Sequence, residues 1–241
     1  MSYELTDEKT SRIIWDAVIK QSVLRAVIKV VPEVVPYLDA ATIKAAVGTY
    51  SGVRDKYYGD VFASVYDFLD TGKRMTSFKN DMRRGMADAF VSAGDIAWSD
   101  GGADLPLDED ALAWLATQQQ AEFGFIDVLF GNLKELRKTE DVDKTATATA
   151  RAEGYCQKLD YVYTAIKMMA KKNQMLTWRL GNTERHCSTC SQLDGKSHRA
   201  SWYIAHDYIP RKPGASMDCG GWNCDCSLLT KSGEVFTIGI E

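Results

Sequence analysis

The sequence predicts a mainly α-helical protein that ends in a small β and loop module, α+β overall. Apolar residues recur at helical spacing through the first two thirds of the 241 residues, and this periodicity stops after Asn173. Five of the six cysteines then fall between Cys187 and Cys226. The predicted domains are therefore a helical domain over residues 1–173 and a cysteine-rich module over residues 174–241.

The five predicted helices cover residues 7–31, 39–69, 77–99, 107–138 and 142–172. Pro32 stops the first helix because proline lacks the N–H that a helix needs. Gly101 and Gly102 belong to a turn sequence that follows the third helix. The fourth helix begins after Pro106 with acidic residues in its first turn, where they face the positive end of the helix dipole.

The fifth helix carries one apolar seam, with residues spaced by four and three: Tyr155, Leu159, Val162, Ile166 and Met169. Such a stripe is typical of core packing, and we favour that interpretation over a seat for a partner helix. Cys156 lies on the same helix and is predicted to be a small core residue.

The module after Asn173 has a different character. Residues 174–180 are typical of a short strand, and residues 227–240 of a strand–turn–strand unit around Ser232 and Gly233. Between these, residues 181–217 are rich in glycine, serine, aspartate and proline and lack helical periodicity, so we expect loops there.

The composition is that of an ordinary soluble globular protein, with 45% hydrophobic and 26% charged residues. The polar N-terminus lacks the features of a secretory signal, and no apolar stretch is long enough to cross a membrane. We therefore expect a soluble protein made in the cytoplasm, without a membrane partner. In that reducing compartment, clustered cysteines indicate metal binding rather than disulfides.

The net charge of −4 argues against a uniformly basic surface of the kind that binds nucleic acid. Between Lys171 and Ala215, however, eight Lys or Arg face three Asp or Glu, an excess of +5 that leaves −9 for the rest of the chain. An ordinary solvated surface is the favoured interpretation of this excess. The alternative is a local basic surface near the cysteines.

The cysteine pattern predicts a structural zinc site. Its candidate ligands are Cys187, Cys190, Cys219, Cys224 and Cys226. Zinc takes four ligands in a tetrahedron, and a Cys-x-x-Cys turn supplies two thiolates from one point of the chain while a distant cluster supplies the others. Cys187 and Cys190 are the firmest candidates, and we favour Cys219 plus one of Cys224 and Cys226. His186 and His198 are reserve ligands, and free core cysteines are the alternative.

A zinc ion held by four thiolates has no open position for water, so we expect no catalysis there and no small-molecule substrate. The histidines lack the H-x-E pattern of zinc deaminases. Nucleophile-elbow, P-loop and dinucleotide-binding motifs are also absent from the sequence. These observations predict a protein that is not an enzyme, without catalytic or organic-cofactor residues.

Three tryptophans, Trp178, Trp202 and Trp222, accompany the cysteines. A small loop-rich module has little core of its own, and large aromatic side chains compensate for this. We favour that role over a stacking platform for single-stranded nucleic acid. The adjacent Gly220 and Gly221 are expected to let the backbone turn tightly beside the metal.

Residues 177–229 resemble the C-terminal region of phage Mu F-type head-morphogenesis proteins, also called minor head proteins. The matching features are a strand tryptophan, a Cys-x-x-Cys, a Leu-x-Gly, a proline before the second cluster and an Asn-Cys-x-Cys ending: Trp178, Cys187 and Cys190, Leu193 to Gly195, Pro210 or Pro213, and Asn223 to Cys226. The long helix over residues 150–172 also fits the family's layout. Many family members carry a histidine where this chain has Gly221, which leaves the third metal ligand open.

The resemblance implies a bacteriophage structural protein of the virion that associates with the portal and the inner capsid during head morphogenesis. Such a protein is made in the cytoplasm of the bacterial host and ends in the particle. Two other classes compete with this interpretation. One is a zinc-module protein of phage or host that binds nucleic acid, and the other is an enzyme whose site the sequence does not reveal.

Overall fold

The computed structural model describes residues 49–237, apart from the short segments 72–74, 104–106, 140–142, 183–184, 211, 213–215 and 222–223. The predicted helix over residues 7–31 and the first part of the helix predicted over residues 39–69 lie outside the described residues. The described chain is mainly helical and carries a three-stranded antiparallel sheet, which confirms the predicted mainly α fold class.

Two compact units make up the described chain. The first comprises residues up to Ile96 together with Asp108–Cys156, and the second comprises Ala97–Leu107 together with residues from Gln157 onward. The predicted boundary after residue 173 falls between the last long helix and the first strand, within the second unit.

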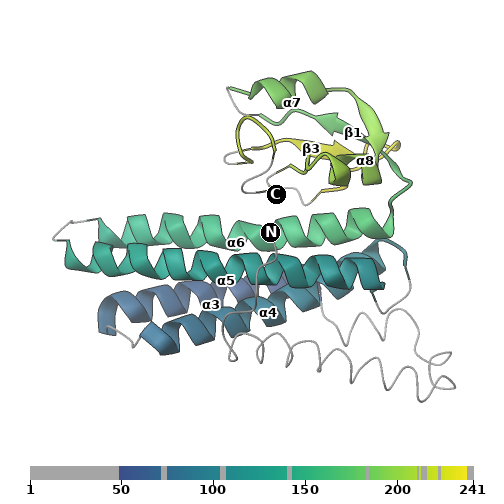
Figure 1. Ribbon diagram of the computed structural model, residues 1–241. Coiled ribbons are helices and arrows are strands. Elements are labelled where there is room, and N and C mark those ends of the chain that lie inside the picture. The colour runs from purple at the N-terminus through teal and green to yellow at the C-terminus, as the bar shows by residue number, and fades with distance from the viewer. Residues whose placement is uncertain are drawn as a thin grey trace, which may run out of the picture. The chain divides into compact units, whose positions relative to one another are not determined.

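The first unit is a bundle of long helices that run side by side (Figure 1). Its helices are α3 (Tyr50–Thr71), α4 (Met75–Asp100), α5 (Glu109–Lys138) and α6 (Lys144–Ala170), of which α4 and α6 end in the second unit. The predicted third, fourth and fifth helices are confirmed, and the described part of the second is helical. Asp108 explains the start of α5, since its carboxylate accepts a hydrogen bond from the Ala111 N–H at 2.8 Å.

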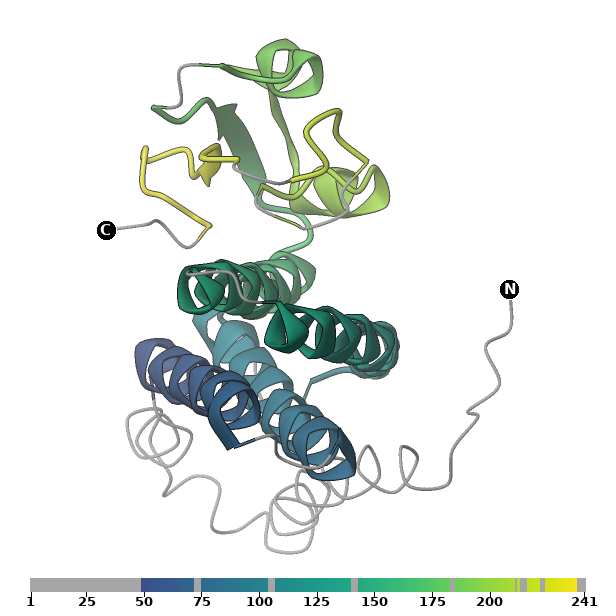
Figure 2. The same ribbon diagram turned by 90° about the vertical axis from the view of Figure 1, so that its left-hand side faces the viewer.

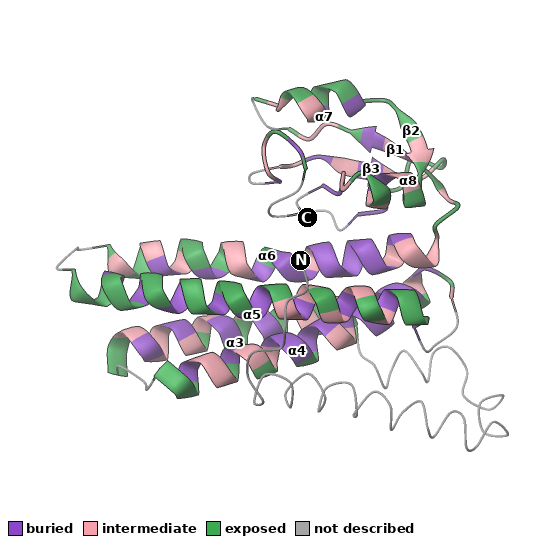
Figure 3. Ribbon diagram, viewed as in Figure 1, coloured by how far each residue is buried: buried purple, intermediate pink, exposed green. Residues whose placement is uncertain are grey.

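The core of the first unit contains an aromatic cluster from three helices. Phe68 of α3 lies 5.0 Å from Phe130 of α5 and 5.4 Å from Phe78 of α4, between ring centroids. All three side chains are buried. Buried and exposed residues alternate along α3 and α5, as helical amphipathicity requires (Figure 3), whereas α4 is buried throughout residues 93–98.

The second unit contains the sheet and two short helices (Figures 1 and 2). Its elements after α6 are β1 (Met175–Arg179), α7 (Ser188–Leu193), β2 (Ser197–Arg199), α8 (Ala200–Ala205) and β3 (Ser227–Leu229). The strand order is β2-β1-β3 with antiparallel pairing, and Thr177 at the centre pairs with Ser197 on one side and Leu229 on the other. The strand predicted over residues 174–180 is thereby confirmed.

Helices α7 and α8 correct the expectation that residues 181–217 contain only loops and lack helix. Each helix has six residues, fewer than two turns, so neither can display the periodicity by which helices are found in a sequence. The predicted strand–turn–strand near the C-terminus is present in reduced form. Strand β3 is followed by a turn at Gly233, and Val235 forms a single bridge with Leu229.

One face of the sheet forms the core of the second unit. Leu176 and Trp178 of β1 are fully buried there, as are Leu228 of β3 and Tyr203 of α8. The Tyr203 hydroxyl donates to the backbone carbonyl oxygen of Lys196 at 3.0 Å, which ties α8 to β2. A bilayer-spanning segment is not found among the described helices, none of which combines the needed length and hydropathy.

The seam on the last long helix packs into the interior, as predicted. Leu159, Val162 and Ile166 are fully buried, and so is Cys156. These positions are therefore core residues, whereas Tyr155 and Met169 at the two ends of the seam are half-buried.

Candidate metal centre

The candidate metal centre is built from two segments that lie far apart in the sequence. The first is the Cys-x-x-Cys turn at the start of α7, and the second is the chain from residue 218 to residue 226, which leads into β3. Cys187 is the N-cap residue of α7, and its Sγ atom accepts a hydrogen bond from the Cys190 N–H at 3.3 Å. This bond closes the Cys-x-x-Cys turn.

All five predicted ligands come together. The sulfur atoms of Cys187, Cys190 and Cys219 lie within 4.8 Å of one another, and so do those of Cys190, Cys224 and Cys226. Cys190 therefore belongs to both groups. A tetrahedral zinc with Zn–S bonds of about 2.3 Å holds four sulfurs about 3.8 Å apart. Each of the two groups within 4.8 Å contains three sulfurs. The arrangement could hold a metal ion.

Backbone hydrogen bonds prepare one of these thiols for ionisation. Burial raises the pKa of Cys187, but hydrogen bonds from the backbone N–H groups of Cys190 and Cys219 outweigh burial and leave that pKa below its ordinary value. The thiolate is the form that binds a metal. Cys187 is thus held in an environment that favours the binding form.

The central thiol has the opposite environment. Hydrogen bonds with the thiols of Cys224 and Cys226 raise the pKa of Cys190 far above its ordinary value. Crowded thiols resist ionising together because their negative charges would repel one another. A divalent cation among them would remove this repulsion and favour the thiolates. The cluster therefore has the chemistry of a cation site.

Two glycines allow the second segment to turn toward the sulfurs. Gly220 and Gly221 have φ angles of 58° and 76°, in the left-handed region that favours glycine. A Cβ atom on Gly221 would lie only 1.8 Å from the backbone oxygen of Lys212. The tight turn predicted at these glycines is confirmed, and the close approach to Lys212 is an additional reason for glycine at position 221.

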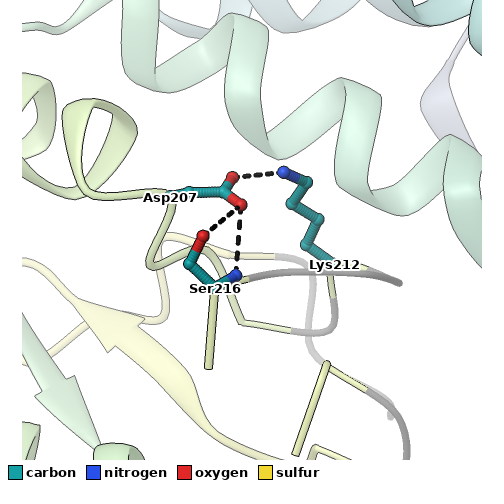
Figure 4. A network of polar contacts seen from close by, with 3 residues as sticks. All are labelled: Asp207, Lys212 and Ser216. Atoms are coloured by element: carbon teal, nitrogen blue, oxygen red, sulfur yellow. Dashed lines mark hydrogen bonds and ion pairs between the residues drawn. The ribbon is translucent and has the colours of Figure 1, made fainter. Parts of the chain in front are cut away.

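Asp207 forms the polar contacts that hold the loop against which Gly221 packs (Figure 4). This residue has a φ angle of 57°, unusual for a residue with a side chain. Its carboxylate forms an ion pair with the Lys212 ammonium and accepts hydrogen bonds from the Ser216 N–H at 3.1 Å and the Ser216 hydroxyl at 3.2 Å. The Lys212 ammonium also lies 5.2 Å from the centre of the Tyr161 ring. These contacts fix the chain just before Cys219.

The histidines proposed as reserve ligands take no part in the sulfur cluster. Within the described part of the chain, the groups able to hold a metal contain only cysteines. His198 instead stacks on Trp202 with ring centroids 3.7 Å apart, and His206 stacks on Trp202 at 4.1 Å. Both rings cover Trp202, and Trp178 is buried, so neither indole offers a free face for a nucleobase. Trp222 lies outside the described residues.

Sequence reasoning missed the aspartates that surround the cluster. Asp218 accepts a hydrogen bond from the Thr189 N–H, and Asp225 from the Asn182 N–H, each at 3.1 Å. Both aspartates are adjacent to cysteines in the sequence, in the strings Asp-Cys and Cys-Asp-Cys. That adjacency was the available clue, because short acidic side chains commonly accept hydrogen bonds from backbone N–H groups of loops.

Comparison with known proteins identifies no relative of this chain. No family model matches it, and neither the curated proteins nor the solved structures contain a significant match.

Proposed function

We propose that this chain is a bacteriophage minor head protein, a structural component of the virion that binds the portal or the inner capsid. Its cysteine cluster holds one structural zinc ion, and the chain is not an enzyme. The observation that carries the zinc assignment is the convergence of five sulfur atoms from two segments of the second unit. The virion assignment rests on the resemblance of residues 177–229 to minor head proteins.

Zinc is the metal that this donor set favours. Thiolate ligands select soft or borderline ions, and four thiolates in a tetrahedron are typical of structural zinc. The strands of the second unit have only three to five residues, so a metal that cross-links its loops would add substantially to its stability. Zinc therefore acts here as an internal cross-link. Purified protein prepared without chelator should contain about one zinc ion per chain by elemental analysis.

In the proposed role, the protein docks on the portal or inner capsid during assembly in the host cytoplasm and remains in the particle. Fractionation of intact virions and proheads, with detection of the protein by antibody, tests its location. A pull-down with purified portal protein tests the partner. The protein should appear in proheads and virions and should bind the portal. Absence from both kinds of particle, together with failure to bind the portal, would refute the proposal.

A zinc-module nucleic-acid-binding protein is the second candidate, and the local excess of +5 between Lys171 and Ala215 favours it. For the head protein, we propose only weak contact with packaged double-stranded DNA. Binding should then weaken steeply between low and physiological salt, because few phosphates are neutralised. Tight, sequence-specific binding at physiological salt would favour the second candidate instead. Fluorescence anisotropy with labelled duplexes at several salt concentrations distinguishes the two.

A further inference from the structure

Asp218 joins the two segments that carry the cysteines. Its carboxylate accepts hydrogen bonds from the Ser188 hydroxyl and from the Thr189 N–H, the latter at 3.1 Å. In return, the Asp218 N–H donates to the Thr189 hydroxyl oxygen at 3.3 Å. These three bonds connect positions that are 29 or 30 residues apart in the sequence.

The positions of these bonds relate directly to the sulfur atoms. Ser188 and Thr189 are the two residues between Cys187 and Cys190, and Asp218 immediately precedes Cys219. Fixing the middle of the Cys-x-x-Cys turn against Asp218 therefore fixes three sulfur atoms relative to one another.

We propose that Asp218 is a positioning residue for the metal centre, which holds the two cysteine segments together so that a metal ion meets sulfurs already in place. This inference rests on the proposed metal site. Closing a long loop costs conformational entropy. If the Asp218 hydrogen bonds already hold the two cysteine segments together, metal binding does not have to offset this loss of conformational entropy. Groups that orient metal ligands in this way typically change metal affinity by about 10- to 100-fold when removed.

A carboxylate near a cation also attracts it by charge, and the two effects need to be separated. Both bonds to the carboxylate end on a single oxygen, Oδ2. Asparagine offers one carbonyl oxygen in the same place but has no charge. Positioning therefore predicts that Asp218→Asn retains most of the affinity and Asp218→Ala loses it. Attraction by charge predicts that both variants lose it equally.

The matched control is Asp194→Ala. The Asp194 carboxylate accepts a hydrogen bond from the Leu180 N–H at 3.1 Å, a bond of the same kind and length. It does not connect the two cysteine segments. Its removal should therefore alter zinc affinity much less than the removal of the Asp218 carboxylate.

The experiment measures Zn²⁺ affinity of the full-length chain by competition with a chromophoric chelator, and Co²⁺ absorption at saturation. Asp218→Ala should bind zinc about 10- to 100-fold more weakly than the unchanged protein, while its saturated Co²⁺ spectrum keeps the same thiolate bands. Asp218→Asn and Asp194→Ala should stay within about threefold of the unchanged protein. Far-ultraviolet circular dichroism confirms that each variant is folded.

Three results would overturn the proposal. The first is an Asp218→Ala affinity equal to that of Asp194→Ala, and the second is an Asp218→Asn affinity as low as that of Asp218→Ala. The third is a changed Co²⁺ spectrum in Asp218→Ala, which would mean that the ligand set itself depends on this residue. Failure of the unchanged protein to bind either ion is a separate outcome, because it would refute the metal centre.

Discussion

Replacement of Gly221 by alanine should disrupt the metal centre without touching a ligand. The new Cβ atom would lie 1.8 Å from the Lys212 backbone oxygen, whereas close C···O contacts are about 3.3 Å, so the two segments must separate by roughly 1.5 Å. The residue also has a φ angle of 76°, which costs a residue with a side chain about 1–2 kcal/mol. Metal–ligand distances tolerate only about 0.2 Å. Cys219 is only two residues away, so its sulfur should be displaced as well. We expect at least a tenfold loss of zinc affinity, because losing a group that orients a metal ligand typically lowers metal affinity by about 10- to 100-fold.

Gly195→Ala provides the control for backbone strain alone. Its φ angle is 70°, close to that of Gly221, but a Cβ atom there would meet nothing within 4 Å. This variant should lose about 1–2 kcal/mol of unfolding free energy and retain its zinc affinity. Chelator competition measures the affinity of both variants, and tryptophan fluorescence in urea measures stability. Equal zinc affinity in Gly221→Ala and Gly195→Ala would refute the reasoning, since the contact with Lys212 would then not constrain the site.

Three further outcomes can be measured on the same protein. Cys187→Ser and Cys190→Ser should each abolish stable zinc binding, whereas Cys156→Ser should leave the zinc content unchanged; loss of zinc in Cys156→Ser alone would show that the ligands are wrongly assigned. Excess chelator should unfold the chain after about residue 181 and preserve most of the helical circular dichroism, because the metal contributes folding energy only to the module that it cross-links. Phe130→Ala should lower the unfolding free energy by about 3–5 kcal/mol in urea titrations, because the side chain is 7% exposed and packs on two other buried rings. Its zinc content should not change, and a stability loss below about 1 kcal/mol would contradict the packing described for the aromatic cluster.

Helix ends that depend on local chemistry could be predicted from the sequence. Gly101 and Gly102 follow the end of α4, and Asp108 precedes the beginning of α5. Their hydrogen bonds reach only residues within about one turn, so the local sequence contains the signal. Gly101 has a second reason that was not predictable. A Cβ atom there would lie 2.4 Å from the Cβ of Ala170, and such a close approach between distant residues is invisible in the local sequence.

The convergence of the five cysteines was predictable from the sequence, but the surroundings of the cluster were not. Cysteine spacing alone brought the five thiols into one hypothesis, because clustered cysteines indicate metal binding in the reducing compartment that the sequence predicts. His198 was kept as a reserve ligand, but the structure stacks its ring on Trp202 and places only cysteines in the candidate metal groups of the described chain. The role of Asp218 was missed because its partners are 29 and 30 residues away.

Carboxylates and the proposed metal would stabilise the second unit in different ways. Strands of three to five residues satisfy few backbone N–H groups, so its loops need other acceptors. Four aspartates accept a hydrogen bond from a backbone N–H at 3.1 Å, three of them from loops and Asp218 from the start of α7: Asp194, Asp207, Asp218 and Asp225. Bonds of this kind contribute about 1.5–3 kcal/mol each at most, and less where water competes. A structural zinc contributes about 10–16 kcal/mol. The proposed zinc would therefore stabilise the module more than any single aspartate does, and we expect chelation to unfold the module for this reason.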